Sequence, residues 1–460
     1  MIYPELYKSK FMGLAAVSLL ALVSIHVLVS YALLPAIKDD SLSFVEPAFN
    51  YCRGTGLISH TFPLDATGQD RFIWHGPLTP LLYAALAPGC SVVDFYYVHV
   101  FFLFLAVSLL ILIFLKKDHG ALACWGAASF TTALITKLGF RPEILVVNWI
   151  LFAYLAVQFP LPVLEGVACA AMFWTSPVSC GLYIVIRIAN GNLPKLLRTC
   201  PEILLGAVIV TVAVLCWYPY PLADLIGGVI TQAKIIAGRS DGDIWTYFVR
   251  SDFVPLFGLV FGLVYIMAVS QSYWYLLLAP FIWWFGLRVP PTWYNVTPVI
   301  VLIYLNIYSA LGQRARNTIA VSLGLCGITG LIQSDMRDAI TVAVAPASYA
   351  RTRSEVSELE IAHRNIVAGP LFLALTNPEI TFSVIDGEWH PKLAPMPSAM
   401  TSNIRLFAEN GSRGTRCPPK TYEDGPLPPS VGGWPFFKST SGWSVFGCSD
   451  RAATAKKTGY

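Results

Sequence analysis

The sequence predicts an all-α polytopic membrane protein with about eleven transmembrane helices, followed by a small extracytoplasmic domain of α+β or β-rich type. Of the 460 residues, 55% are hydrophobic and only 13% are charged, whereas a soluble domain carries about 25% charged residues. Apolar runs able to cross a bilayer recur up to residue 333 and then stop, and Pro, Gly and Ser become frequent. The chain therefore divides into a transmembrane domain, 1–333, and a soluble domain, 334–460. The net charge of +4 is too small to indicate a nucleic-acid partner.

The first apolar run, residues 11–36, contains no charged residue and is too long for a cleavable signal peptide. Asp39 and Asp40 follow it at once, and Glu46 comes within the next two helical turns. These carboxylates lie where the chain leaves the membrane. They could simply mark the polar boundary of the helix, or they could act on a lipid-borne substrate.

The first outer loop, residues 37–93, contains a Pro-broken amphipathic stretch from Trp74 to Tyr83. Such a stretch is suited to lie along the membrane interface, so we expect an interfacial helix over about 75–84. His75, at its start, could contact a substrate or could be a hydrogen-bonded histidine of the interface.

The later hydropathy maxima predict the remaining spans. The segments 162–174 and 178–189 are short and are separated by Trp174-Thr175-Ser176-Pro177, so they could be two half-spans that meet near the outer surface. Polar backbone at that depth is tolerated only where it is buried in protein or lines a cavity. The predicted spans after the first are 94–115, 120–138, 143–159, 162–174, 178–189, 202–217, 253–270, 273–287, 296–312 and 317–333.

Lys and Arg residues in the short loops predict the orientation. The basic loops include Lys8 and Lys10, Lys116 and Lys117, and Arg314 and Arg316. This places the N-terminus in the cytoplasm, and it places the loops 37–93 and 218–252 and the domain 334–460 outside.

Four of the ten cysteines lie clearly outside the predicted spans. They can pair as Cys52–Cys90 in the first outer loop and as Cys417–Cys448 in the terminal domain, because an oxidising compartment allows disulfides. Six others lie in or beside spans, where a free cysteine behaves as a small apolar residue.

The terminal domain has alternating apolar patterns that predict short strands. An amphipathic helix is expected over 354–368. The expected strands are 339–344, 380–385, 403–407 and 443–446.

Several motifs now occur in an order that resembles the GT-C glycosyltransferases, the multi-pass class that uses polyprenyl-phosphate sugars as donors. The resemblance covers roughly residues 1–333. One departure is Thr175-Ser176-Pro177, where the class usually has a basic residue in place of Ser176. The motifs are Asp39-Asp40, the small-residue segment 48–56, the interfacial segment 75–84, Arg141-Pro142-Glu143, Tyr218-Pro219-Tyr220-Pro221, Gln232-Ala233-Lys234 and Arg288-Val289-Pro290-Pro291-Thr292-Trp293-Tyr294.

The resemblance implies an inverting transfer of a sugar from a polyprenyl-phosphate donor to a hydroxyl of a lipid-, glycan- or protein-linked acceptor. Such a transfer needs a base for the acceptor proton and cations for the departing phosphate. We expect Asp40 as the base and Asp39 as its electrostatic partner. The expected phosphate-binding residues are Arg141, Arg288, Lys234 and Lys137, and the expected substrate-binding residues are Glu46, His75, Glu143 and Tyr294.

Other interpretations of these residues remain open. Arg141 and Glu143 could form only an interfacial ion pair, and Arg288 and Lys137 could be snorkelling anchors. The acids form no recognised metal-ligand spacing, so a divalent cation is possible but not favoured.

Other functions also remain open. A lipid-linked polysaccharide polymerase or ligase and a multi-pass transporter or flippase are the alternative functions. The partners expected are the lipid-linked donor, its acceptor and the bilayer, and the bacterial cytoplasmic membrane is favoured over the endoplasmic reticulum.

Overall fold

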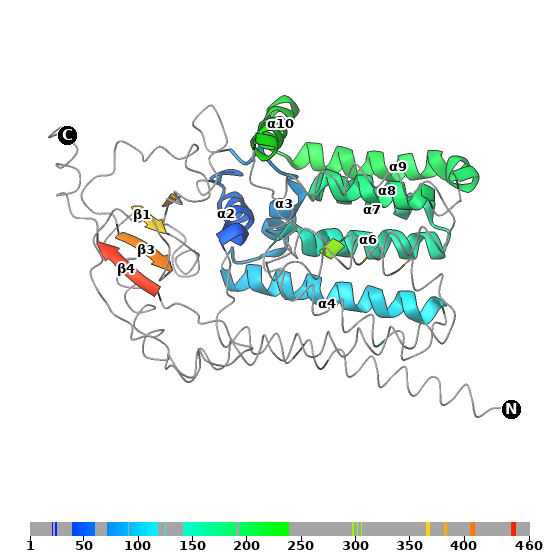
Figure 1. Ribbon diagram of the computed structural model, residues 1–460, viewed down its shortest axis with the longest axis horizontal. Helices are drawn as coiled ribbons and strands as arrows, with labels where there is room; N and C mark the ends of the chain where they lie inside the picture. The colour runs from blue at the N-terminus through cyan, green and yellow to red at the C-terminus, as the bar shows by residue number, and fades with distance from the viewer. Residues whose placement is uncertain are drawn as a thin grey trace. The chain divides into compact units, whose positions relative to one another are not determined.

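The computed structural model describes five long stretches of the chain and four short strands (Figure 1). The chain divides into two compact units. Unit 1 comprises Met1–Val27, Ile73–Leu81 and His99–Leu331, and unit 2 comprises Leu28–Phe72, Leu82–Val98 and Ile332–Tyr460. The described residues are 39–59, 71–90, 92–117, 141–189, 193–238, 365–368, 381–383, 405–409 and 443–447, with the helical residues 21, 24, 125, 297, 298, 301 and 305.

The described part of unit 1 is helical. Prolines set several boundaries, because proline at the first helical position has a suitable φ and needs no N–H partner. Pro142 and Pro162 stand at such positions, and Pro177 is the first residue of the next helix. The helices are α6 (Pro142–Gln158), α7 (Pro162–Thr175), α8 (Pro177–Ala189), α9 (Leu193–Trp217) and α10 (Leu222–Gly238), with parts of α3 (Leu78–Leu86) and α4 (Val92–Lys117).

Helix α7 packs against α6, α8 and, most extensively, α9. Two glycines make the approach to α9 close. A Cβ atom on Gly166 would collide with the carbonyl oxygen of Ile203, and a Cβ atom on Gly206 would collide with that of Val163. The backbones of α7 and α9 therefore touch where only glycine fits.

A buried ion pair joins the far ends of α7 and α8. Glu165 Oε1 accepts hydrogen bonds from Arg187 Nε at 2.8 Å and from the Tyr183 hydroxyl at 3.0 Å. The Glu165 side chain is only 5% exposed. The two bonds satisfy a carboxylate that would otherwise be buried at high cost.

Among the described residues, one helical stretch, Leu196–Trp217, is long and apolar enough to cross a membrane. Its large apolar side chains remain exposed. Shorter apolar stretches occur in α4, α6, α7, α8 and α10. The large apolar residues of α9 that are more than half exposed are Leu197, Leu204, Leu205, Val208, Ile209 and Val212.

Unit 2 contains α2 (Asp39–Cys52), which starts at the first residue of the acidic pair. Aromatic contacts pack it: Phe44 meets Phe72 with centroids 6.4 Å apart, and Phe49 meets Phe95 at 6.1 Å. At its end, Cys52 forms a disulfide with Cys90. The first of the two expected disulfides is therefore confirmed, whereas Cys417 and Cys448 lie outside the described residues.

A glycine-dependent turn follows α2. The backbone N–H of Gly54 bonds the carbonyl of Tyr51, and Gly54 has φ +79°, a conformation that favours glycine. The chain then pairs with itself at Ile58 and Arg71.

Unit 2 also contains four strands, β1 (Asn365–Ala368), β2 (Thr381–Ser383), β3 (Arg405–Glu409) and β4 (Trp443–Gly447). Their order is β2-β1-β3-β4, with β1 parallel to both neighbours and β4 antiparallel to β3. The expected strands at 380–385, 403–407 and 443–446 correspond to β2, β3 and β4. The expected helix 354–368 is wrong over its last four residues, because β-branched Ile366 and Val367 pair on both sides in the sheet.

The described helices agree with the predicted spans 94–115, 143–159, 162–174 and 178–189 to within two residues, whereas α9 starts nine residues before the expected 202. The interfacial helix expected over 75–84 begins only at Leu78, because Pro77 disfavours a helical conformation at Gly76. The spans 253–270, 273–287 and 317–333 and the strand 339–344 lie outside the described residues, as do most residues of 11–36, 120–138 and 296–312.

Candidate functional site

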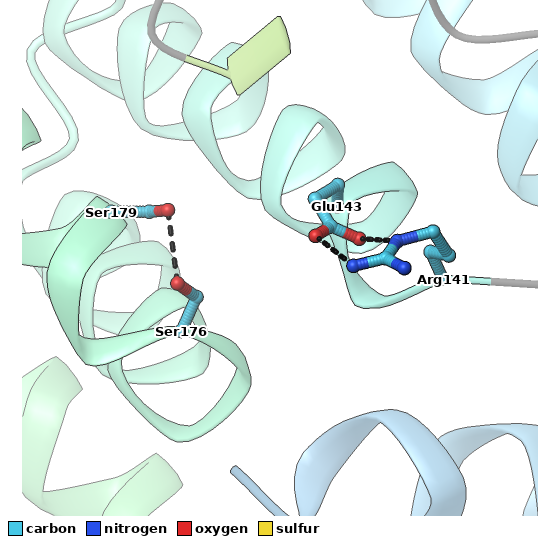
Figure 2. A network of polar contacts seen from close by, with 4 residues as sticks. All are labelled: Arg141, Glu143, Ser176 and Ser179. Carbon is cyan, nitrogen blue, oxygen red and sulfur yellow. Dashed lines mark hydrogen bonds and ion pairs between the residues drawn. The ribbon is translucent and has the colours of Figure 1, made fainter. Parts of the chain in front are cut away.

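A two-point ion pair lies at the start of α6 in unit 1 (Figure 2). Arg141 Nε bonds Glu143 Oε2 at 3.0 Å, and Arg141 Nη2 bonds Glu143 Oε1 at 3.0 Å. The side chains are 12% and 13% exposed. Arg141 is the residue before the helix, and Glu143 belongs to its first turn, where a negative charge is favoured by the helix dipole.

The segment before α3 meets the break between α7 and α8. A Cβ atom on Gly76 would collide with the carbonyl oxygens of Trp174 and Thr175. No side chain therefore fits at Gly76, and the backbone of this segment is held against the end of α7. The contact places the neighbouring residue, His75, within the field of both Glu143 and Arg141.

The α7–α8 break is a polar turn held by side chains. Thr175 is fully buried, and its hydroxyl donates to the carbonyl of Ala171 at 2.7 Å and accepts from Trp149 Nε1 at 3.3 Å. Ser176 ends α7, and its hydroxyl lies 3.0 Å from that of Ser179 in α8 (Figure 2). The Trp149 bond ties this turn to α6, so the turn and the Arg141–Glu143 pair belong to one packed region.

His75 is partly buried, and its Nδ1 atom is enclosed. Burial lowers its pKa to about 4; the Glu143 carboxylate and a backbone hydrogen bond with Gly76 oppose this shift, and Arg141 adds to it. His75 is therefore neutral near pH 7. A neutral imidazole can donate and accept one hydrogen bond each but carries no charge to a phosphate.

The acidic pair occupies the first two positions of α2 in unit 2. Glu46, on the same helix, is only 5% exposed, so its side chain is buried. The structure thus brings together His75, Arg141 and Glu143 in one unit, and it describes the three acids of α2 in the other.

The remaining expected site residues fall elsewhere. Lys234 lies on α10 and is exposed. Lys137, Arg288 and Tyr294 lie outside the described residues. Within the described stretches, no group of three His, Cys, Asp or Glu residues is arranged to hold a metal ion.

Some residues of this region were not expected from the sequence. Trp149 and Ser179 entered no motif, and their hydrogen bonds depend on how α6, α7 and α8 pack. Gly76 was noted only as part of a motif. The signal in the sequence was the glycine itself, since glycine is the residue used where a backbone makes a close approach.

Comparison of the chain with protein-family models, with curated proteins and with solved structures gives no significant match.

Proposed function

We propose that this chain is an integral membrane glycosyltransferase. It moves a sugar from a polyprenyl-phosphate donor to the hydroxyl of a glycan, lipid or protein acceptor on the extracytoplasmic face of a bacterial cytoplasmic membrane. The observation that carries the proposal is the gathering of His75, Arg141 and Glu143 beside the α7–α8 break. His75 lies 66 positions before Arg141 in the chain. The motif of His75 and the motif shared by Arg141 and Glu143 had both been singled out for their likeness to the same enzyme class.

The polar region suits an anionic group. Arg141 supplies charge-assisted hydrogen-bond donors, and arginine matches the geometry of phosphate oxygens. The helices α6 and α8 both begin here, at Pro142 and Pro177, and helix N-termini carry a partial positive charge that favours phosphate. Lys234, Lys137 and Arg288 are proposed as further cations for the departing phosphate.

A multi-pass arrangement of about eleven spans belongs to this proposal. The exposed apolar surface of α9 supports it, because lipid chains would cover side chains that water would not. The Cys52–Cys90 disulfide supports an outer position for the loop 37–93, because disulfides persist in oxidising compartments.

The acids of α2 are the proposed reactive groups. Successive helical residues point about 100° apart, so only one of Asp39 and Asp40 can face a given acceptor hydroxyl. We assign Asp40 as the base that takes the acceptor proton while the phosphate leaves the anomeric carbon. Asp39 is proposed as its electrostatic partner, a second negative charge next to the base.

The first prediction tests this assignment. Asp40→Asn removes the proton acceptor and keeps the size of the side chain, so transfer should fall by about 100-fold or more. Asp39→Asn should have a milder effect. The measurement is turnover of the purified protein with a panel of radiolabelled polyprenyl-phosphate sugars.

Expression level and affinity for the donor should stay near the values of the unmodified chain in both variants. Full turnover in both would leave the acidic pair as a helix boundary only. Absence of transfer from every donor by the unmodified chain would remove the proposed function itself.

A further inference from the structure

Helix α10 has an exposed apolar face, although it belongs to the predicted outer loop 218–252. Leu222, Ile226 and Ile230 are 42%, 51% and 48% exposed. They follow one another at intervals of four residues, so they form one stripe along the helix, called the α10 stripe below. Exposed apolar surface of this kind marks a contact with a membrane or with another apolar partner.

A different face of α10 is occupied by the protein itself. Leu225 is buried, and a Cβ atom on Gly228 would collide with the carbonyl oxygen of Ile73. Ile73 comes two residues before His75, and all these residues belong to unit 1. By this face α10 therefore packs against the segment that carries His75, and the α10 stripe lies on another side of the helix.

The chain turns sharply between α9 and α10. Pro219 and Pro221 lie between Trp217, the last residue of α9, and Leu222, and proline does not continue a helix. In Figure 1, α9 runs across the view, whereas α10 is strongly foreshortened beside its end, so the two helix axes cross steeply. If α9 crosses the bilayer, α10 therefore runs along the bilayer surface.

The dimensions and polar groups of α10 also favour a surface position over a second crossing. Its apolar stretch, Leu222–Gln232, is about 16 Å long at 1.5 Å per residue, roughly half the thickness of the hydrocarbon core. Thr231 is exposed, but its hydroxyl donates to the carbonyl of Gly227 at 2.9 Å and so needs no water. Lys234 follows Ile230 by four residues and is exposed, so its ammonium can reach the phosphates of lipid headgroups.

We infer that α10 is an interfacial helix: the α10 stripe inserts into the outer leaflet, and Lys234 lies at the level of the headgroups. The inference rests on the membrane arrangement of the proposed function, in which the Trp217 end of α9 lies at the outer surface, and not on sugar transfer. It places Ile73 within about one helix diameter, roughly 10 Å, of the bilayer. The candidate site around His75 is thus close to the phosphates of membrane lipids.

The test measures the depth of spin labels on the whole chain in vesicles of phosphatidylethanolamine and phosphatidylglycerol. One residue at a time is replaced by p-acetylphenylalanine, whose ketone takes a nitroxide label without reaction at the ten native cysteines. Collisions with oxygen, which concentrates in the bilayer, and with a water-soluble nickel chelate give the depth of each label. The labelled positions are the three residues of the α10 stripe and Lys234.

Labels on the α10 stripe should collide with oxygen and be shielded from nickel. A helix that lies flat keeps the three labels at one depth, about 5–10 Å into the boundary between headgroups and acyl chains. A crossing helix would instead separate the labels at Leu222 and Ile230 by about 12 Å. The label at Lys234 should be accessible to nickel.

Val208, Val212 and Leu215 of α9 are the matched control, because they too are apolar and exposed. On a helix that crosses the membrane, their labels should approach the outer surface in order, by about 10 Å from first to last. The thermal midpoint of each labelled protein separates a lost fold from a changed depth. A protein with a lowered midpoint is left out, and the other positions of the same stripe still give the depth and its slope.

Three results along the α10 stripe overturn the inference. Nickel access like that of a label in water places α10 outside the lipid, and a depth gradient like that of α9 makes α10 a crossing helix. Shielding from both reagents means that protein covers the stripe, either another segment or a second copy of the chain. If the α9 labels also lie in water, the membrane arrangement of the proposed function fails together with the inference.

Discussion

At the scale of single residues, His75 makes the stability of the protein depend on pH. Its pKa is lowered to about 4 by burial, whereas an unfolded chain has the ordinary value of about 6.5. Below 6.5 the unfolded state gains a proton that the folded state does not bind, so stability is lost as the pH falls from 6.5 toward 4. Between pH 7 and pH 4.5 the loss amounts to about 2–3 kcal/mol.

The second prediction follows from this loss of stability at low pH. His75→Asn cannot titrate, so its thermal midpoint should fall less than that of the unmodified chain between pH 7 and pH 4.5. The measurement is thermal unfolding in detergent at both pH values. The acidic residues titrate in both proteins and cancel in the comparison, so equal losses would show that His75 is charged or exposed in the folded state.

The sequence predicted some single-residue features and missed others for a physical reason. Arg141 and Glu143 are two positions apart in the sequence. That spacing alone was enough to suggest that they form an ion pair. The pairing of Cys52 with Cys90 followed from the predicted loop. By contrast, the contact of Gly76 with Trp174 joins segments almost 100 residues apart, and hydropathy carries no information about such a contact.

At the scale of elements, the close packing of α7 on α9 depends on glycine. Gly206 lies against the backbone of α7, whereas a Cβ atom on Gly227, in α10, would meet no atom within 4 Å. The third prediction compares the same substitution at the two sites. Gly206→Ala must push the helices apart and should cost about 1–3 kcal/mol, while Gly227→Ala should stabilise by about 0.5–1 kcal/mol through helix propensity.

The measurement is the thermal midpoint of each purified variant, with the unmodified chain as reference. The thermal midpoint should fall in Gly206→Ala and rise in Gly227→Ala. A higher midpoint for Gly206→Ala would mean that α7 and α9 do not touch through their backbones. Only one side of this contact has a recognisable pattern in the sequence, since Gly166 and Ala170 form a small-residue repeat on α7, whereas Gly206 has no small residue four positions away on α9.

Element types were predicted well where apolar runs are long, and less well elsewhere. Helices α4, α6, α7 and α8 agree in their bounds with predicted spans, because their apolar runs are long and three of them begin at a proline. The segment 365–368 was assigned to a helix because its pattern continued from 354. Its strand conformation depends on pairing with Thr381–Ser383 and Arg405–Glu409, partners that lie far away in the sequence.

At the scale of the whole molecule, the disulfide and the predicted spans together predict on which side of the membrane each loop lies. Cys52 and Cys90 close a loop with a sequence separation of 38, which contributes about 4 kcal/mol in the chain-entropy model of disulfide stability. Such a bond requires an oxidising compartment. Ten predicted spans follow Cys90, counted from 94–115 to 317–333, and an even number returns the chain to the same side.

The fourth prediction therefore concerns two measurements at once. In denatured, unreduced protein, maleimide–polyethylene glycol should label Cys90 in Cys52→Ser but neither cysteine in the unmodified chain. The variant should thus carry one adduct more, although it has one cysteine fewer. A reporter fused after Asp338 should be active only outside the cytoplasm, on the side where the disulfide forms.

The two results support each other only if the span count is even. One adduct fewer in Cys52→Ser would mean that no disulfide forms, and the outer position of the loop 37–93 would lose its support. A disulfide together with a reporter active in the cytoplasm would show an odd number of spans between Cys90 and Asp338. Because α7 and α8 add two crossings as full spans and none as half-spans, neither arrangement of this pair causes that outcome. The error would then lie in another predicted span or in an apolar stretch outside the predicted spans, such as Leu222–Gln232 of α10.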